Sequence, residues 1–168
     1  MHYSYMASPL GPILIAGDAA GLRLINFQPD SALSQPAPDW VEDRQPLREA
    51  LDQLDAYFAG TMQDFTLKLA PAGTPFQQSV WHALQDIPYG ETTSYGTLAK
   101  QLGKPKASRA VGAANGRNPL AIVIPCHRVI GSTGKLTGYA GGLDLKKALL
   151  ALERRYAPSS EPFNLPFT

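Results

Sequence analysis

Residues 72–75, Ala-Gly-Thr-Pro, separate two parts of the chain that have different sequence patterns. Short apolar segments between glycine and proline turns precede them, whereas helical spacing of apolar residues dominates after them. Thr74 is a favoured residue type for capping a helix, and Pro75 suits its first position. The expected organisation is a supporting domain at 1–71, a second domain at 75–156 and a tail at 157–168.

Composition narrows the class of protein. With 44% hydrophobic and 17% charged residues, the 168-residue chain has the composition of a folded globular protein. It contains no run of about 20 apolar residues that could span a bilayer. Residues 1–5 lack the basic start and apolar stretch of a signal peptide. We therefore expect a cytoplasmic protein without a membrane anchor.

The first half predicts a small α/β unit. Turns at residues 9–12 and 17–21 alternate with apolar, β-branched segments, which predicts an antiparallel meander of strands within 2–27. Residues 28–45 are rich in Pro, Asp, Ser and Gln and indicate a loop.

A helix and a further strand are expected after this loop. Pro46 opens the helix and Gly60 ends it. Its apolar residues fall at helical spacing: Leu47, Ala50, Leu51, Leu54, Tyr57 and Phe58. Residues 64–69 alternate apolar and polar, which predicts another strand. No cluster of catalytic residue types occurs in this half, so its expected role is support.

The net charge of +1 conceals a strong asymmetry. Residues 1–89 carry four basic and ten acidic residues, whereas residues 90–156 carry eleven basic and three acidic ones. The second half could therefore meet a polyanion, or the two halves could attract each other.

Two short helices around a tight turn are predicted in the basic half. The first runs from Ser94, its cap, to Gly103, and the second covers 107–115. This pattern fits a helix-turn-helix, although helix hairpins also occur in many helical cores. The surplus of positive charge favours DNA; it comes from Lys100, Lys104, Lys106, Arg109 and Arg117.

Small residues dominate the second of these helices, including Ala110 and Gly112. A helix that reads the major groove usually offers Asn, Gln or Arg to base edges. A small-residue surface instead permits close approach to a narrow groove, and Arg109 would project from it as one long probe. The alternative is that small residues only let helices pack closely.

Cys126 is the single cysteine, so no intramolecular disulfide can form. One Cys and three His are a poor set for zinc, which usually has four such ligands in structural sites. We expect no metal and no cofactor. A lone cysteine is most often a small buried hydrophobe.

The neighbours of Cys126 indicate reactivity. Residues 121–124 are apolar and predict a buried strand that would hold the thiol rigidly. His127 and Arg128 would add positive charge, which lowers a thiol pKa and suits nucleophilic chemistry. Adjacent strand residues point to opposite faces, so contact between Cys126 and His127 would need a bend or a bridging water.

Polar residues elsewhere could support this site. Asn118 precedes the apolar segment and can brace the turn with side-chain hydrogen bonds. A last helix begins at Asp144, with an expected apolar stripe of Leu145, Ala148, Leu149 and Leu152. Glu153, near its end, could orient His127, or it could be a solvated surface residue.

The motif Pro125–Val129, Pro-Cys-His-Arg-Val, resembles the active-site signature of the O6-alkylguanine-DNA alkyltransferases. The resemblance covers about 75–155 and includes Tyr95, Arg109, Asn118, the Tyr-Ala-Gly-Gly segment 139–142 and Glu153. It implies an α/β (α+β) fold: a small RNase-H-like N-terminal α/β domain, then a mostly helical C-terminal domain with a winged-helix-like helix-turn-helix.

The resemblance also implies roles at the thiol. Cys126 would be the alkyl acceptor, and its proton would pass through a water to His127, which Glu153 orients. Asn118 would brace the active-site segment. Tyr95 would help rotate the DNA backbone and donate a hydrogen bond to guanine N3.

On the DNA side, the resemblance implies that Arg109 enters from the minor groove and replaces the flipped-out nucleotide. Ser94, Tyr95, Ala110 and Gly112 would be further DNA contacts. The carbonyls of Cys126 and Val129 would receive the guanine amino group. The remaining pocket residues would be Tyr139, Ala140, Gly141 and Asn115. Ala140, Asn115 and Ala121 differ from some relatives, which bears on the alkyl groups that the pocket accepts.

The expected function is direct-reversal DNA repair. A protein that is monomeric when free would irreversibly transfer an alkyl group, such as methyl, from O6-alkylguanine in double-stranded DNA to Cys126, once per molecule. O4-alkylthymine is a further candidate substrate. The alternatives are a non-catalytic lesion-binding protein, a cysteine hydrolase using Cys126 and His127, and a transcription regulator with an inert cysteine.

Overall fold

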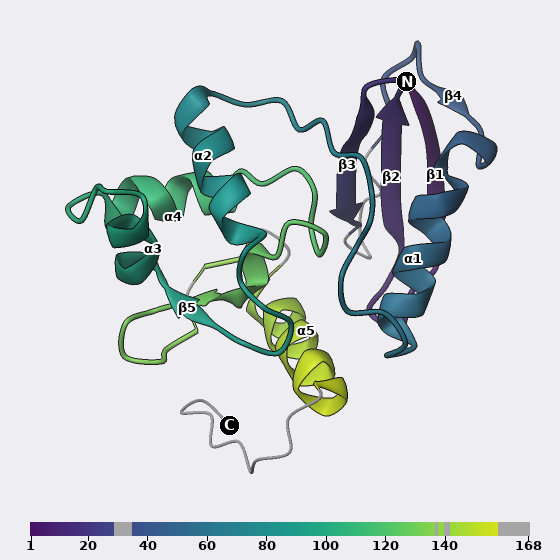
Figure 1. Ribbon diagram of the computed structural model, residues 1–168. Coiled ribbons are helices and arrows are strands. Elements are labelled where there is room, and N and C mark those ends of the chain that lie inside the picture. The colour runs from purple at the N-terminus through teal and green to yellow at the C-terminus, as the bar shows by residue number, and fades with distance from the viewer. Residues whose placement is uncertain (29–34, 137, 140–141, 158–168) are drawn as a thin grey trace. The chain divides into compact units, whose positions relative to one another are not determined.

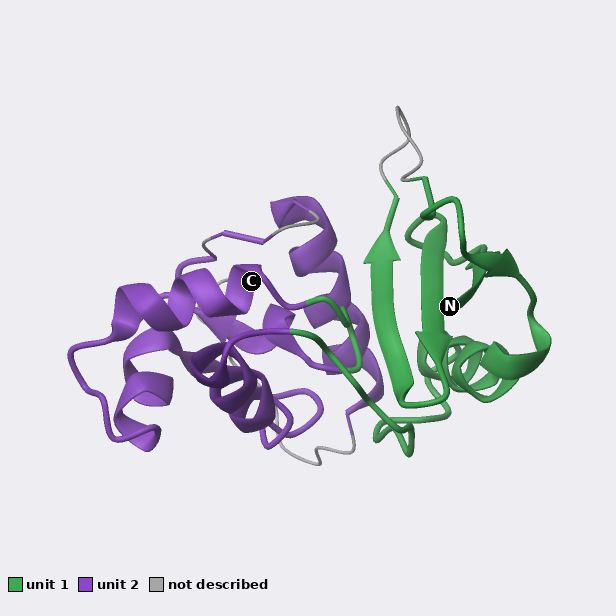
Figure 2. Cartoon of the chain, turned by 90° about the horizontal axis from the view of Figure 1, so that it is seen from above, with its two compact units in different colours: residues 1–72, 119–123 green, residues 73–118, 124–168 purple. Residues whose placement is uncertain are grey.

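The computed structural model describes residues 1–28, 35–136, 138–139 and 142–157 (Figure 1). The chain forms two compact units, which Figure 2 colours separately. Unit 1 comprises Met1–Ala72 and Pro119–Val123, and unit 2 comprises Gly73–Asn118 and Ile124–Thr168. The short segment 119–123 therefore belongs, by its contacts, with residues far earlier in the sequence. The mixed α/β fold class expected from the sequence is confirmed.

Unit 1 contains a four-stranded sheet in the order β3-β2-β1-β4. Its strands are β1 (His2–Met6), β2 (Ile13–Asp18), β3 (Gly21–Phe27) and β4 (Val41–Glu42). The first three form the predicted antiparallel meander. β4 lies within the expected loop 28–45, where two residues pair in parallel with β1. A segment this short carries no alternation that the sequence could reveal.

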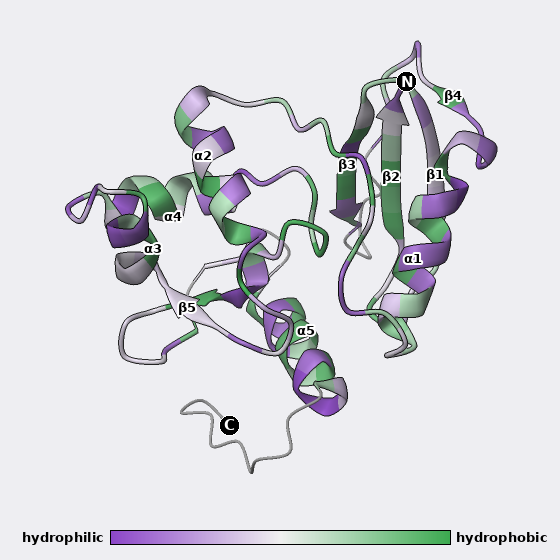
Figure 3. Cartoon of the chain, viewed as in Figure 1, coloured by the Kyte–Doolittle hydropathy of each residue, from purple (hydrophilic) through white to green (hydrophobic). Residues whose placement is uncertain are grey.

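One helix covers this sheet. The 3-10 turn η1 (Gln45–Leu47) leads into α1 (Arg48–Phe58), and the six apolar residues expected on its buried side are all buried. Gly60 ends the helix with a φ of 79°, a conformation in which glycine has no steric penalty. α1 lies along β1 and β2, and β2 is hydrophobic over much of its length (Figure 1, Figure 3). Burial of these apolar surfaces stabilises unit 1.

The strand expected at residues 64–69 is wrong. The segment is extended and its side chains alternate in exposure, but it contributes only the single bridge Leu22–Leu69. Gln53 of α1 explains part of this result. Its amide oxygen accepts from the Thr66 N–H at 3.0 Å, and its amide nitrogen donates to the Thr66 hydroxyl at 2.9 Å. A side chain thus satisfies backbone that a strand would pair with another strand.

Unit 2 is mostly helical. Its elements are α2 (Pro75–Leu84), β5 (Thr93–Ser94), α3 (Tyr95–Gln101), α4 (Ser108–Gly116), η2 (Cys126–Arg128), β6 (Val129–Ile130) and α5 (Leu143–Tyr156). Thr74 caps α2 as predicted, in a reciprocal capping box with Gln77. α2 and α3 both pack on α4, and the Trp81 indole donates to the Ala114 carbonyl at 2.9 Å. β6 follows η2 directly in the chain and pairs in parallel with β5. Within the described residues, no helix combines the length and apolar character needed to cross a membrane.

The buried strand expected at residues 121–124 is also wrong. The segment is buried, but it is a pair of three-residue turns. Val123 N–H donates to the Ala121 carbonyl at 2.8 Å, and Cys126 N–H donates to the Ile124 carbonyl at 2.8 Å. Ile122, between the first pair, has a φ of 73°, which is rare for a β-branched residue. Pro125, between the second pair, has no N–H to offer a neighbouring strand.

The buried side of α5 differs from the predicted stripe. Leu149 is buried as expected, but Leu145, Ala148 and Leu152 are only half-buried. The fully buried positions are Lys146, Leu149, Leu150 and Glu153. Helical spacing holds, but the face is rotated because two charged residues find partners inside unit 2.

Candidate active site around Cys126

Cys126 lies at the first position of η2, with 6% of its surface exposed. Burial raises the pKa of this thiol above its ordinary value. Hydrogen bonding by Asn118 and the positive charge of Lys146 act in the opposite direction. These neighbours favour the ionised form of the thiol, but burial has the larger effect and leaves its pKa raised.

His127, next in the chain, is fully buried and faces Glu153 of α5. Its Nε2 lies 2.5 Å from Glu153 Oε2, so the expected contact between these residues is present. Since a carboxylate only accepts, Nε2 carries a proton and donates to Glu153. Nδ1 is buried and has no hydrogen-bond partner among the described residues. In a neutral ring Nδ1 would therefore be the atom that takes up a proton.

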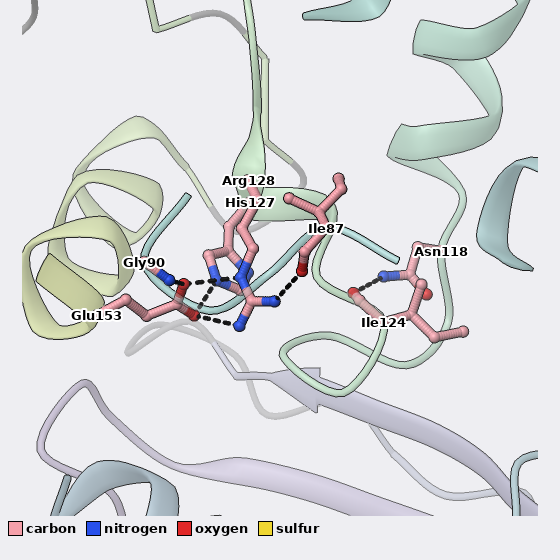
Figure 4. A network of polar contacts seen from close by, with 7 residues as sticks. All are labelled: Ile87, Gly90, Asn118, Ile124, His127, Arg128 and Glu153. Carbon is pink, nitrogen blue, oxygen red and sulfur yellow. Dashed lines mark hydrogen bonds and ion pairs between the residues drawn. The ribbon is translucent and has the colours of Figure 1, made fainter. Parts of the chain in front are cut away.

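Arg128 contacts the same carboxylate (Figure 4). Its Nε lies 2.7 Å from Glu153 Oε1 and its terminal nitrogen 3.0 Å from Oε2, while the other terminal nitrogen donates to the Ile87 carbonyl at 2.7 Å. Burial alone would raise the pKa of Glu153, but the charges and hydrogen bonds of His127 and Arg128 outweigh it and hold that pKa well below the usual range. The guanidinium expected to act on the thiol is instead directed at Glu153.

Two asparagines fix the backbone around the thiol. Asn118 Nδ2 donates to the Ile124 carbonyl at 2.8 Å, which braces the turn before Cys126 (Figure 4). Asn115 of α4 is buried, and its Nδ2 donates to the Cys126 carbonyl at 3.3 Å. The helix α4 is thereby connected directly to the reactive residue.

The expected substrate pocket is described in part. Val129 of β6 is buried, and Tyr139 is half-buried with its hydroxyl beside the thiol. Burial, followed by the charge of Cys126, raises the pKa of Tyr139, so its phenol stays protonated and can donate. Ala140 and Gly141 lie outside the described residues.

The surface of α3 and α4 carries the residues expected to meet DNA. Arg109 and Ala110 are exposed on α4. Ser94 caps α3 by accepting from the Thr97 N–H at 3.0 Å. Gly112 faces the Tyr95 ring, 3.7 Å from the position that a Cβ would take. The expected basic residues around them, Lys100, Lys104, Lys106 and Arg117, are exposed as well.

Sequence reasoning missed two residues of this site. Arg128 was assigned to the thiol rather than to Glu153, and Lys146 was not singled out at all. The available signal was the helical spacing of Lys146 with Leu149 and Glu153, which places a lysine on the buried side of α5. The described residues hold no group of three or more His, Cys, Asp or Glu side chains that could bind a metal ion.

The fold and the site define a class of protein in which a buried Cys-His pair accompanies a basic helical surface. Comparison of the sequence with known protein families identifies the family. Residues 75–155 match the DNA-binding domain of 6-O-methylguanine DNA methyltransferases, and residues 1–71 match the ribonuclease-like domain of the same proteins. The chain therefore belongs to the 6-O-methylguanine DNA methyltransferase family.

Curated relatives and solved structures agree with this family. A methylated-DNA–protein-cysteine methyltransferase of Methanosarcina acetivorans is 59% identical over 91% of this chain and 98% of its own length. A methylated-DNA–protein-cysteine methyltransferase of Mycolicibacterium paratuberculosis is 50% identical over 95% of this chain and 96% of its own length. The crystal structure of Mycobacterium tuberculosis OGT in complex with DNA matches with a TM-score of 0.85 and 51% identity, covering 95% of this chain and 96% of that one.

Proposed function

We propose that this chain repairs DNA by transferring the alkyl group of O6-alkylguanine, methyl in particular, to Cys126. The observation that carries the proposal is a single buried cysteine whose neighbour, His127, has one nitrogen held by Glu153 and the other lacking a described partner. Family membership and the names of the relatives support methyl transfer from DNA to a protein cysteine. The acceptor Cys126 weighs against a non-catalytic lesion-binding protein.

The proposed reaction is one displacement. The Cys126 sulfur forms a bond to the alkyl carbon, and the bond from that carbon to guanine O6 breaks. The thiol proton passes through a water to His127 Nδ1, and the departing guanine anion takes up a proton, so guanine is restored. Hydrogen bonds to N3 from Tyr95 and to O6 from a backbone N–H of the loop at Tyr139 and Ala140 would stabilise this anion. Because a thioether has no ready route back to a thiol, each molecule reacts once and needs no cofactor.

A base inside a duplex cannot reach a buried thiol, so the damaged nucleotide must leave the stack, at a cost of a few kcal/mol. In our proposal α4 enters the minor groove and Arg109 fills the vacated position. Its exposure, beside the small Ala110, supports this role. Ser94, Tyr95 and Gly112 would add contacts. The proposed partner is double-stranded DNA, and the proposed location is the cytoplasm.

The guanine amino group would be received by the carbonyls of Cys126 and Val129. Each already accepts a side-chain donor, from Asn115 and Lys146 respectively. A carbonyl has two lone pairs, so each can accept a second donor. Tyr139, Ala140 and Gly141 would form the remaining wall of the pocket, and O4-alkylthymine is a further candidate for it.

The intact mass of the protein tests this proposal after incubation with duplex DNA carrying O6-methylguanine. We expect a gain of one methyl group, located on Cys126, that stops when every molecule has reacted. The variant Cys126→Ser should bind the DNA and gain no mass. An unmodified wild-type thiol, or continued release of product, would contradict the proposal and favour a binding protein or a hydrolase.

Arg109→Ala tests the role of the probe. It should slow transfer from duplex DNA far more than transfer from free O6-benzylguanine, because the free base needs no flipping. Arg117→Ala, which removes an exposed charge at the end of α4, is the matched control and should weaken duplex binding in a salt-dependent way. If Arg109→Ala slowed alkyl transfer equally from both substrates, the probe role would be refuted.

A further inference from the structure

Lys146 is a lysine that the proposed reaction does not use, yet it is completely buried. Its exposed fraction is 0%, whereas Lys147, the next residue of α5, is exposed. Lysine is almost never fully buried unless its ammonium is paired, because removing a charge from water is expensive. A residue kept here against that cost must have specific partners.

Those partners come from three separate segments of unit 2. Lys146 Nζ donates to the Val129 carbonyl of β6 at 2.6 Å and to the Gly138 carbonyl at 3.5 Å. It also lies 6.0 Å from the centre of the Tyr95 ring at the start of α3. One ammonium therefore joins α5 to β6, to the loop that follows β6 and to α3, each of which contributes a residue of the expected site.

The charge of Lys146 also acts on the thiol. The charged or titratable groups around Cys126 are Lys146 from α5, Tyr139 from the loop after β6, and the adjacent cluster of His127, Arg128 and Glu153. Arg128 and Glu153 form a pair and largely neutralise each other. Positive charge that favours the Cys126 thiolate comes from Lys146.

The coupling is mutual. Burial lowers the pKa of Lys146 to about 8, and the charge of Cys126 opposes that shift. When the thiol ionises, the ammonium is stabilised, and when the ammonium is present, the thiolate is stabilised. Each group thus favours the charged form of the other.

We propose that Lys146 is a positioning residue for the acceptor thiol: its buried ammonium fixes the loop after β6 and supplies the positive charge that faces the Cys126 thiolate. This inference deepens the proposed function and rests on it only in taking the thiolate as the reactive form. After transfer the sulfur is a neutral thioether, and the ammonium no longer faces an opposite charge.

Titration of the thiolate by its ultraviolet absorbance, without DNA, tests this role. The chain has one cysteine, so the signal of Cys126 is obtained by subtracting the curve of Cys126→Ser, which contains only the absorbance of the ionising tyrosines. Lys146→Met should raise the thiol pKa by about one unit or more, which leaves on the order of tenfold less thiolate at neutral pH. The rate of alkyl transfer should fall by the same factor at neutral pH and recover as the pH rises.

Lys147→Met is the matched control on the same helix and should leave both curves unchanged. Lys146→Arg retains the charge and should keep the thiol pKa below that of Lys146→Met. An unchanged thiol pKa in a folded Lys146→Met protein, judged by circular dichroism, would overturn the proposal. If the wild type transferred no alkyl group from DNA, the proposed function would be refuted instead. The two failures are therefore distinguishable.

A measurement on the wild type covers the case in which the variants do not fold. NMR titration of labelled lysine side chains should show a lower pKa for Lys146 after Cys126 has been S-methylated by a small reagent, because the thiolate charge is then gone. An equal pKa before and after methylation would also overturn the proposal.

Discussion

The two units bury different kinds of polar side chain. In the described part of unit 1 the buried polar residues are neutral: Ser4, Gln28 and Gln53. In that of unit 2 they are Asn115, His127, Arg128, Lys146 and Glu153. Buried charges contribute little net stability and often cost more than apolar residues of the same size. The comparison teaches that unit 1 avoids buried charge, whereas unit 2 concentrates it beside the proposed acceptor thiol.

The largest effect should come from removing one member of the charged cluster. Glu153→Gln leaves Arg128 buried without its carboxylate, and losing one partner of a buried pair typically costs about 3–5 kcal/mol. Urea unfolding at neutral pH measures this loss. A loss of unfolding free energy below about 1 kcal/mol, the value of an exposed pair, would show that the buried charges of unit 2 behave like surface charges.

Acid should remove part of the same stabilisation. The folded-state pKa of Glu153 lies below its unfolded value, so its contribution is complete above about pH 4.3, the ordinary pKa of glutamate, and declines as the pH falls toward the folded pKa. The difference in unfolding free energy between wild type and Glu153→Gln should therefore narrow on acidification. A difference that does not change with pH would show that Glu153 acts by shape alone.

A smaller effect is expected in the apolar core of unit 1. Ile15 of β2 is fully buried, and Ile15→Val removes one methylene, at a cost of about 0.5–1.5 kcal/mol. The rate of alkyl transfer by the folded protein should stay at the wild-type value, since unit 1 is proposed to support and not to react. Stability comes from urea unfolding and the rate from intact mass against time. A slower transfer at unchanged folding would assign unit 1 a direct part in the reaction.

The smallest effect concerns the surface pair of unit 1. Arg23 Nε lies 3.1 Å from Asp18 Oδ2, and both side chains are about a third exposed. Asp18→Asn should lower the unfolding temperature only slightly, and salt should reduce even that difference. Thermal unfolding at low and high salt measures it. A loss as large as that of Glu153→Gln would mean that burial does not govern the strength of these pairs.

Local rules predicted the parts of the fold that local sequence determines. The cap at Thr74, the buried positions of α1 and the meander are properties of short segments. The failure at 64–69 depends on a distant partner, because Gln53 supplies hydrogen bonds there. The failure at 121–124 has a local cause: Pro125 has no N–H, and Ile122 has a φ of 73°, so the segment turns instead of extending. An apolar run alone therefore does not decide between a strand and a turn.

In the candidate site too, features indicated by short sequence motifs were predicted, and features that depend on other parts of the chain were not. Cys126, His127 and Glu153 were predicted because an adjacent pair and a family motif indicate them, and the contact of His127 with Glu153 is present. The partners of Arg128 and Lys146 could not be derived, because nothing in the sequence indicates which carboxylate or carbonyl a long cation reaches. The DNA-contact and pocket roles stay predictions.

The return of residues 119–123 to unit 1 has a consequence for how the protein is made. Ile25 of β3 donates to the Pro119 carbonyl at 2.9 Å and accepts from the Ala121 N–H at 3.1 Å. A ribosome that has produced only residues 1–72 has therefore made a sheet with an unpaired position on β3, and an unpaired edge can pair with another chain. The segment that closes it emerges immediately before Cys126. During synthesis, the scaffold is completed only as the reactive residue leaves the ribosome.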